Sequence, residues 1–410
     1  MFHIPDPTES EGFIEDGIKP QHILRLNDAS VSLTAFLVID NPEIGLPSGG
    51  VRMAPDVTLQ EITRLARAMS LKCVSFQIPS GGGKAGIVGD QNNETRDLLI
   101  TAFGDMISPY IKQDLYYPGT DMGTTYADLE KIFKAANVKP WLNENIKLVR
   151  NGQTISDHFT GYGVVFCLDT LYHGIKSLKS QVNAPKVILE GFGKVGKSAA
   201  LCLKELGYKL LGLSTIRGAI FDEDGLDIDE LLKLKIQYGD EVVNQYNSRN
   251  LVKVEKEKLF ELSSEYPIDF IIPGARPDAI HKQNIDKIDA KAIVPVANIP
   301  YANGMVEILE DRGIIAFPDF ISNAGASVFL SRVNFQSNYD ELFSFMKGEL
   351  VDKTNEIVKE ASLHKCAIYN YARTKAIDEI KKYIKQRRRK VVRLNKKTPE
   401  IQSSPSLALP

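Results

Sequence analysis

The sequence has 410 residues, of which 43% are hydrophobic and 25% charged, and its formal net charge is −2. This composition is typical of a soluble globular protein, and the length leaves room for two ordinary domains, each with its own core. The four cysteines form no CxxC pair, the N-terminus is acidic without a signal layout, and no apolar run approaches a membrane span, so we expect a reducing cytoplasm and neither a zinc site, a disulfide framework nor contact with a membrane.

Two hydrophobic stretches between residues 21 and 40, HILRL and LTAFLVID, predict strand or helix ends. A glycine pair, Gly49 and Gly50, follows just before Arg52. Such a pair usually marks a surface turn, but it also lets the backbone approach a small ligand closely.

A helix is predicted where Leu59, Ile62, Ala66 and Met69 recur at the spacing of a helical apolar face. A further step of three residues reaches Lys72, which places a cation on the core-facing side of that helix. Lysine is rarely buried without a reason.

The alternation of apolar and polar side chains over residues 74–78 predicts a half-buried strand, and Pro79 and the glycines after it predict a bend leading to Lys84. A lysine in a partly desolvated pocket near another cation holds its proton less tightly, which makes it a usable base or electrostatic catalyst. The alternative is that neither lysine has a functional role: Lys72 extends its ammonium group to solvent, and Lys84 is an ordinary residue of a turn.

Another helix is predicted over residues 94–111, and a third begins near Tyr126. Asp121 lies between Gly119 and Gly123 just before it. An aspartate there is most often a turn former or a helix cap. Beside two unusual lysines, it is also a candidate for exchanging a proton with an amine substrate.

A polar segment, residues 151–159, predicts a hinge between domains, and Thr160 opens an apolar helix that runs to about Tyr172. An apolar strand over 187–189 then leads into a GxGxxG turn and a helix over 197–206. In this order the glycines let a pyrophosphate touch the backbone, and the start of the helix stabilises its charge, so a dinucleotide site is favoured over a merely tight turn. The residues of this turn are Gly191, Phe192, Gly193, Lys194, Val195 and Gly196.

The ribose position of this predicted site departs from the usual pattern. The second strand ends in Ser214, Thr215, Ile216 and Arg217, where an acidic residue would bind the 2′-hydroxyl of NAD. Arg217 can pair with a phosphate instead, which favours NADP(H) over NAD(H). NAD(H) remains possible if the following loop folds back and brings an aspartate to the ribose. The candidates in that loop are Asp222 and Asp224.

Further strands of a parallel sheet are predicted over 269–275, 292–298 and 313–320, and mostly helical structure over 338–386. The predicted fold class is therefore α/β with two domains: an N-terminal α/β substrate domain and a Rossmann-like, doubly wound dinucleotide-binding domain, followed by C-terminal helices. The expected boundaries are 1–155, 156–335, 336–386 and a tail over 387–410.

The predicted tail is strongly basic. Between Lys381 and Lys397 there are ten Lys or Arg and no Asp or Glu, and a polar, proline-containing end follows. Such blocks are usually solvated or disordered. Nothing that resembles a nucleic-acid-binding fold accompanies it, so we expect no nucleic-acid partner.

The stretch MSLKCVSFQIPSGGGK, with GGVRM before it and PGTDMGT after it, resembles the glutamate/leucine/phenylalanine/valine dehydrogenase family. The likeness extends from about residue 20 to 385. It implies that Lys72 binds the substrate α-carboxylate, that Lys84 is the catalytic lysine and that Asp121 is the acid/base group. The reaction implied is reversible oxidative deamination of an L-amino acid to a 2-oxo acid and ammonia.

The resemblance also implies a nicotinamide side of the cleft, because the motifs VAN and ISNAG are similar to those that line it in the family. By this likeness Ala297, Asn298 and Asn323 contact the cofactor, and Gly325 packs close behind. The remaining cofactor-binding candidate is Thr160. The family further implies C-terminal helices that return to the first domain and a homo-oligomer, a hexamer or an octamer.

The choice of amino acid depends on two positions. Glutamate-specific members have a lysine directly before the glycine pair and a serine shortly after NAG, where this chain has Ser48 and Leu330. A side-chain carboxylate without a cation is costly to bury, so an apolar or small side chain is favoured. Glutamate dehydrogenase is the alternative, because the chain length and the insert FDEDGLDIDELL resemble those enzymes. An alternative of another class is a nucleotide-binding regulatory homologue without turnover.

Overall fold

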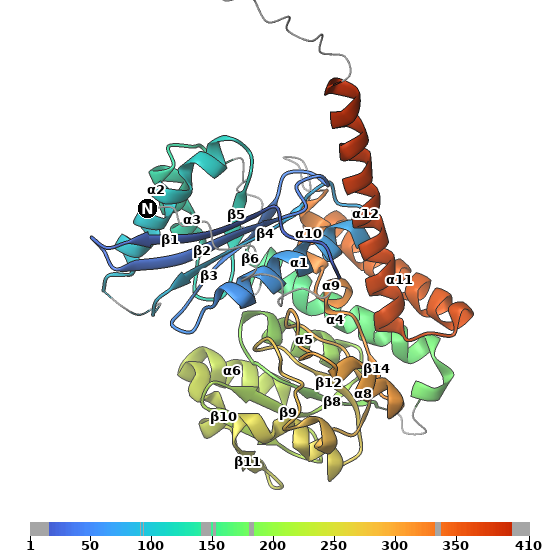
Figure 1. Cartoon of the computed structure of the whole chain (residues 1–410). Helices are drawn as coiled ribbons and strands as arrows, with labels where there is room; N and C mark the ends of the chain where they lie inside the picture. The colour runs from blue at the N-terminus through green and yellow to red at the C-terminus, as the bar shows by residue number, and fades with distance from the viewer. Residues whose placement is uncertain are drawn as a thin grey trace, which may run out of the picture.

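The computed structural model describes residues 16–395, apart from 91, 93, 141–148, 151–152, 180–183 and 333–337. Two α/β units, each built on its own sheet, lie one above the other, and the last helices pack along the side of both (Figure 1). The predicted fold class is confirmed. The predicted domain boundaries stay predictions.

The first unit is a five-stranded sheet in the order β1-β2-β4-β3-β5. Strands β4, β3 and β5 are parallel to one another, whereas β2 runs antiparallel to both of its neighbours, β1 and β4. Helix α1 covers one face, and α2 and α3 cover the other. The bounds are β1 His22–Asp28, β2 Leu33–Asp40, β3 Ser48–Ala54, α1 Leu59–Ser75, β4 Gly82–Val88, α2 Arg96–Lys112, β5 Tyr117–Thr120 and α3 Tyr126–Ala135.

The prediction of a strand over 74–78 and a glycine bend is wrong. Helix α1 continues to Ser75 because Leu71 and Val74 still bury their side chains on its apolar face. The glycines then begin strand β4 itself. A Cβ on Gly82 would lie 2.1 Å from the carbonyl oxygen of Ala66, so only glycine lets this strand pass directly beneath α1.

The second unit is a seven-stranded sheet in the order β11-β10-β9-β8-β12-β13-β14. Strands β9, β8, β12, β13 and β14 are parallel, and β10 and β11 add an antiparallel edge. Helices α4 and α5 cover one face, while η5 and α8 cover the other, as a doubly wound sheet requires. The strands are β8 Lys186–Leu189, β9 Lys209–Thr215, β10 Gly218–Phe221, β11 Val252–Val254, β12 Ile268–Ile272, β13 Ala290–Ile293 and β14 Ile315–Ala316. The helices are α4 Ile155–Gly174, α5 Lys194–Glu205, α6 Ile228–Tyr238, η5 Lys256–Ser264, α8 Met305–Asp311, α9 Asp319–Ser322 and α10 Gly325–Leu330.

Most of the segment predicted as a hinge is already helical. Residues 151–152 lie outside the described part, but α4 begins at Ile155, more than a turn before Thr160. Thr154 starts it, because its side chain accepts a hydrogen bond from the amide of Asp157.

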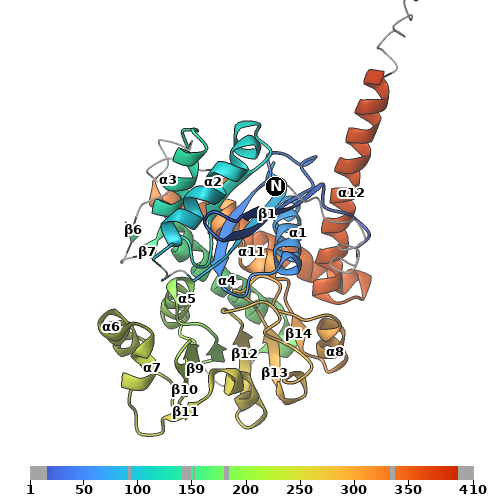
Figure 2. The same ribbon diagram turned by 60° about the vertical axis from the view of Figure 1, so that its left-hand side comes forward.

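Two long helices, α11 (Tyr339–His364) and α12 (Ile368–Asn395), are the last elements of the described part of the chain. Helix α11 packs on α4, and α12 turns back onto α1 of the first unit. The prediction of disorder from residue 387 is wrong up to Asn395, because α12 continues through the basic run and extends clear of the body (Figure 2). Residues 396–410 lie outside the described part.

Candidate active site

A lysine, an arginine and an aspartate meet across three neighbouring strands of the first sheet. Lys84 comes from β4, Arg52 from β3, and Asp121 follows β5 directly. Oδ2 of Asp121 lies 2.9 Å from Nζ of Lys84 and 2.9 Å from Nε of Arg52. Arg52 also pairs with Glu61 of α1. The structure therefore joins Lys84 and Asp121, as their predicted roles require.

The loop of Asp121 is fixed independently of this pairing. The hydroxyl of Thr124 accepts a hydrogen bond from the amide of Asp121 at 3.0 Å and donates one to the carbonyl of Val51 at 2.7 Å. Thr125, not Asp121, caps the following helix α3. The side chain of Asp121 is thus free of the capping role that its position in the sequence first suggests.

The charges of this cluster shift each other's protonation. Burial alone would raise the pKa of the Asp121 carboxyl, but the charges of Lys84 and Arg52 hold it below its usual value. Burial lowers the pKa of Lys84 more than Asp121 raises it, and the charge of Arg52 lowers it further. An amine and a carboxylate so placed can exchange a proton with a substrate bound beside them.

Lys72 approaches the same place from α1. Its relative exposure is 5%, and its Nζ lies 3.5 Å from the carbonyl oxygen of Asn323, across the boundary between the two units. Burial lowers the pKa of Lys72 to about 8, although the charge of Asp319 opposes this shift, and the nearby charge of Lys84 adds to it. The predicted apolar face of α1 therefore does bury its lysine, next to the other two predicted groups.

The GxGxxG turn has the shape of a cradle for a dinucleotide. Gly191 has a positive φ of 87°, and a Cβ on Gly196 would lie 1.9 Å from the carbonyl oxygen of Gly191. A Cβ on Gly193 would meet nothing within 4 Å, so open space faces the start of α5 at this residue. These three environments match the tight turn, the close helix packing and the ligand approach that the motif needs. Of the residues between them, Phe192 has a buried side chain, whereas Lys194 is exposed and Val195 half-buried.

The predicted nicotinamide residues lie together beyond strand β13. The side-chain amide of Asn323 donates to the carbonyl of Val296 at 3.0 Å and to Oδ1 of Asn298 at 2.9 Å, and the amide of Ala297 donates to Pro273 at 2.9 Å. Among the described residues, nothing donates to the buried Oδ1 of Asn323. An acceptor left unsatisfied in this way fits the carboxamide N–H₂ of a nicotinamide.

Helix α4 approaches the same loop closely. A Cβ on Gly325 would lie 2.2 Å from the carbonyl oxygen of Phe159 and 3.1 Å from the amide nitrogen of Thr160. The hydroxyl of Thr160 donates to the carbonyl of Ser156 within α4. Thr160 therefore stands beside the ISNAG motif, although it does not open its helix.

The ribose end of the sheet holds Arg217 in an ion pair. Ser214 accepts hydrogen bonds from the amides of Gly191 and Phe192, which ties β9 to the glycine turn. Thr215 is bonded to the carbonyl of Asp240, and Nε of Arg217 lies 3.0 Å from Oε1 of Glu241.

The suggestion that Asp222 or Asp224 folds back to the ribose is wrong. Strand β10 runs antiparallel to β9, so the chain has travelled back along the sheet by the time it reaches these residues. The amide of Asp222 donates to Leu211, near the start of β9, and Asp224 is bonded to Asn250.

The predicted specificity residues occupy separate elements. Gly49 and Gly50 lie within β3 rather than in a turn, and a Cβ on Gly50 would stand 2.6 Å from Cβ of Asp121. Oγ of Ser48 lies 2.8 Å from Oγ of Ser80, so within the part of the chain that the structure describes the side-chain partner of Ser48 is another hydroxyl group. Leu330 ends α10 and packs, half-buried, against the core of the second unit.

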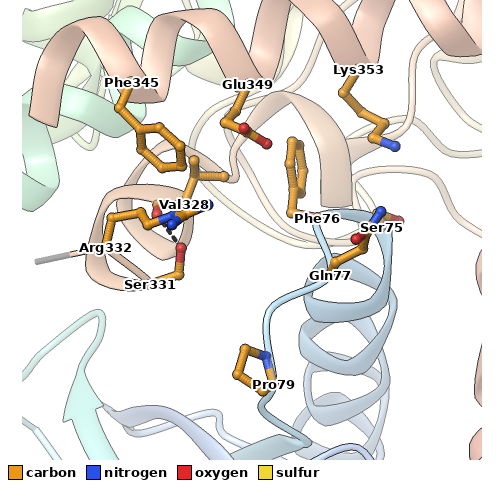
Figure 3. A pocket seen from close by; sticks show the side chains of 10 residues that line it. All are labelled: Ser75, Phe76, Gln77, Pro79, Val328, Ser331, Arg332, Phe345, Glu349 and Lys353. Atoms are coloured by element: carbon orange, nitrogen blue, oxygen red, sulfur yellow. Dashed lines mark hydrogen bonds between the residues drawn. The ribbon is translucent and has the colours of Figure 1, made fainter.

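A cavity of about 400 Å³ opens between the end of α1, helix α10 and helix α11. Figure 3 shows Phe76 and Phe345 on its walls, Arg332 beside Phe345, and Glu349 and Lys353 reaching down from α11. Its lining includes neighbours of Ser80 and Leu330 but none of Lys72, Lys84 and Asp121. The cavity therefore adjoins the predicted side-chain pocket and is not the catalytic centre.

Two charged residues of the site were not predicted. Arg52 stands two residues after the glycine pair, and Asp319 lies near the end of the strand-like GIIAFPDF. Both positions could be noticed in the sequence, but only the fold shows that Arg52 holds Asp121 and that Asp319 lies near Lys72.

Over the described ranges, no three His, Cys, Asp or Glu side chains gather as a metal site needs. Nor does any helix within those ranges combine the length and apolarity that crossing a membrane takes.

Comparison with known proteins agrees with this geometry. The model of the Glu/Leu/Phe/Val dehydrogenase dimerisation domain matches residues 21–137, and the model of Glutamate/Leucine/Phenylalanine/Valine dehydrogenase matches residues 152–397. The chain belongs to this family. It is therefore an NAD(P)-dependent amino-acid dehydrogenase, and the resemblance seen in the sequence is confirmed.

Curated relatives within the family include enzymes of both cofactor types. An NAD-specific glutamate dehydrogenase of Staphylococcus aureus (strain COL) is 28% identical over 87% of this chain and 84% of its own length. An NADP-specific glutamate dehydrogenase of Saccharolobus shibatae is 32% identical over 70% of this chain and 67% of its own. Among solved structures, the hetero-hexameric glutamate dehydrogenase from Thermus thermophilus is 20% identical, with a TM-score of 0.77 over 94% of this chain and 99% of that one.

Proposed function

We propose that this dehydrogenase catalyses the reversible oxidative deamination of an L-amino acid with an apolar or small side chain, giving a 2-oxo acid and ammonia. The observation that carries the proposal is the contact between Lys84 and Asp121 beside a buried Lys72. In a bound substrate, one carboxylate and one amino group must meet one cation and one proton acceptor, and this cluster offers both.

Each residue has a part that follows from its surroundings. Lys72, protonated below a pKa of about 8, holds the α-carboxylate. Asp121, kept ionised by its two cations, accepts a proton from the substrate ammonium. Lys84, whose pKa is lowered by burial, activates the water that adds to the iminium carbon. Asn323 and the GxGxxG turn would hold a nicotinamide dinucleotide, which when bound would supply the hydride acceptor for the α-carbon.

The preference for an uncharged side chain rests on the neutral pair of Ser48 and Ser80. A glutamate side chain buried beside two hydroxyl groups and Leu330 would lack a cation. An unpaired carboxylate in an apolar pocket is disfavoured by several kcal/mol, about a thousandfold or more in binding.

Glutamate is the second candidate, and two observations favour it. The curated relatives described above are named as glutamate dehydrogenases. Arg332 and Lys353 line the cavity that adjoins Leu330, so two cations lie near the predicted side-chain pocket and are candidates for pairing with a glutamate carboxylate.

For the cofactor we propose NADP(H). No carboxylate stands on the last residues of β9, and the exposed pair between Arg217 and Glu241 is worth no more than about 1 kcal/mol, so a 2′-phosphate can displace it. Substitution of Glu241 by Gln should raise the preference for NADPH over NADH. If the wild type prefers NADH and E241Q abolishes that preference, Glu241 is the ribose acceptor and the proposal is wrong.

We also propose a homo-oligomer. The segment 21–137 matches a domain described as a dimerisation domain, and the Thermus relative is described as hetero-hexameric. Light scattering of the purified protein tests this directly.

A single assay tests the reaction. The purified protein is mixed with ammonium, NADPH or NADH, and a panel of 2-oxo acids that give leucine, valine, phenylalanine, alanine or glutamate. Ammonium-dependent oxidation of the nucleotide is expected with the apolar or small acids at the highest kcat/KM. A higher kcat/KM for the precursor of glutamate favours the second candidate, and no turnover with any acid, at intact nucleotide binding, indicates a regulatory protein.

A further inference from the structure

Asp319 lies at the point where the two halves of the site meet, and no role in the reaction has been given to it above. It is the first residue of α9 in the second unit and has a relative exposure of 2%. A buried carboxylate needs partners. Its Oδ2 accepts a hydrogen bond of 2.8 Å from the amide of Ile299.

Ile299 is held in a conformation that it would not adopt alone. Its φ is +47°, in the left-handed region, which is strongly unfavourable for a β-branched residue. Two hydrogen bonds compensate: its amide donates to Asp319, and its carbonyl accepts from the amide of Asp278 at 2.9 Å. Because Asn298 directly precedes Ile299, the carboxylate of Asp319 also fixes the placement of Asn298 next to Asn323.

Helix α9, which begins at Asp319, also reaches Lys72: the amide of Asn323 donates to the carbonyl of Asp319 at 3.0 Å, and Nζ of Lys72 lies 3.5 Å from the carbonyl oxygen of Asn323. The charge of Asp319 is the strongest influence that keeps the Lys72 ammonium protonated against the effect of burial. In turn, burial raises the pKa of Asp319, while the Ile299 amide and the Lys72 charge oppose that rise. The other charged or titratable groups near Lys72 are Lys84, Cys73 and Asp121, and those near Asp319 are Arg64, Tyr301 and Tyr369.

We propose that Asp319 is a positioning residue with two functions: its hydrogen bond holds the Asn298–Ile299 turn against the nicotinamide, and its negative charge supports Lys72 as the binder of the substrate carboxylate. This inference rests on the proposed function. It adds that the cofactor and substrate subsites share one carboxylate, which lies in the second unit while the lysine lies in the first.

Two substitutions separate the functions. Asp319→Asn keeps an oxygen acceptor for the Ile299 amide but removes the charge, whereas Asp319→Ala removes both. The matched control is Asp269→Asn, a buried aspartate of the same unit that accepts a 2.8 Å bond from the Lys186 amide and pairs with Lys291 at 2.8 Å. Asp269 lies near the start of the central strand β12, whereas the site lies beyond the carboxyl ends of the parallel strands.

The readouts are the KM for the best 2-oxo acid from pH 6.5 to 9.5 and the Kd for NADPH, measured by fluorescence. Because a protonated Lys72 binds the acid, KM should rise as the pH passes through the pKa of this lysine. In Asp319→Asn the rise should begin at least one pH unit lower, which is about a fivefold higher KM near pH 8 and about a tenfold higher KM above pH 9, with a Kd for NADPH within about twofold of wild type. In Asp319→Ala the Kd should also rise about fivefold, the net worth of one hydrogen bond.

A KM profile of Asp319→Asn that matches wild type, or a shift equal to that of Asp269→Asn, overturns the electrostatic function. An unchanged Kd for NADPH in folded Asp319→Ala overturns the positioning function. If the wild type turns over no 2-oxo acid, the proposed function fails, and the comparison of nucleotide binding between Asp319→Ala and Asp269→Asn still decides whether Asp319 positions the turn.

Discussion

Replacing Lys72 with methionine should make the protein more stable while it weakens substrate binding. Methionine has a similar length but no charge to bury. Burial lowers the pKa of Lys72 from 10.5 to about 8, and each pKa unit corresponds to 1.36 kcal/mol. The charged lysine therefore costs the folded state about 3 kcal/mol at pH 7, and Lys72→Met should recover most of that amount.

The pH dependence of this gain has a definite sign. The folded-state pKa lies below the unfolded one, so the cost is complete below about pH 8 and falls as the pH rises toward 10.5. The stability difference between variant and wild type should thus shrink to about 1 kcal/mol at pH 9.5.

Urea unfolding at pH 7 and pH 9.5 measures this difference, and the same preparations give the KM for the 2-oxo acid. KM should rise by about ten- to a hundredfold, because a charge-assisted hydrogen bond is lost. A variant that is no more stable than wild type at pH 7, or a gain that stays constant with pH, would refute the claim that Lys72 is buried at a cost for the sake of binding.

Three further outcomes follow from the geometry. Asp121→Asn should lower kcat by about a hundred- to ten-thousandfold in the deamination assay, because the substrate ammonium loses its proton acceptor. Gly196→Ala should destabilise the protein by about 1–3 kcal/mol in thermal unfolding, whereas Gly193→Ala should leave the melting temperature unchanged and raise the Kd for NADPH. Arg64→Ala and Asp278→Ala should show a coupling of up to about 1 kcal/mol in a double-mutant cycle, because their side chains join the two units through two hydrogen bonds of 2.6 Å.

Each of these outcomes can be contradicted. Full turnover in folded Asp121→Asn would remove the aspartate from the reaction. Equal melting temperatures for the two glycine variants would mean that the turn is less tightly packed than described. Strictly additive effects of Arg64→Ala and Asp278→Ala would show that this ion pair contributes nothing to the junction of the units.

The sequence predicted the dinucleotide-binding half well because its signals are local. A strand, a GxGxxG turn and a helix follow one another within about twenty residues, and the apolar strands after them alternate with recognisable turns. The apolar face of α1 likewise placed Lys72 correctly, since helical periodicity needs only neighbouring residues.

Where a structure depended on contacts distant in sequence, the predictions failed. Nothing next to Gly82 shows that a helix backbone lies across it, so the glycines were taken for a bend rather than a strand. The antiparallel return of β10 that carries Asp222 away from the ribose is a matter of strand order. Composition alone could not show that the basic run to Asn395 continues a helix already anchored on α1.

The path of the chain between its two units limits how they can move. The chain passes from the first unit to the second before α4, and it returns where α11, packed on α4, gives way to α12, packed on α1. We expect these two connections to permit an opening motion between the units and to oppose a rotation of one unit relative to the other. A single proteolytic cut in either connection is therefore expected to leave the two units joined by the other one.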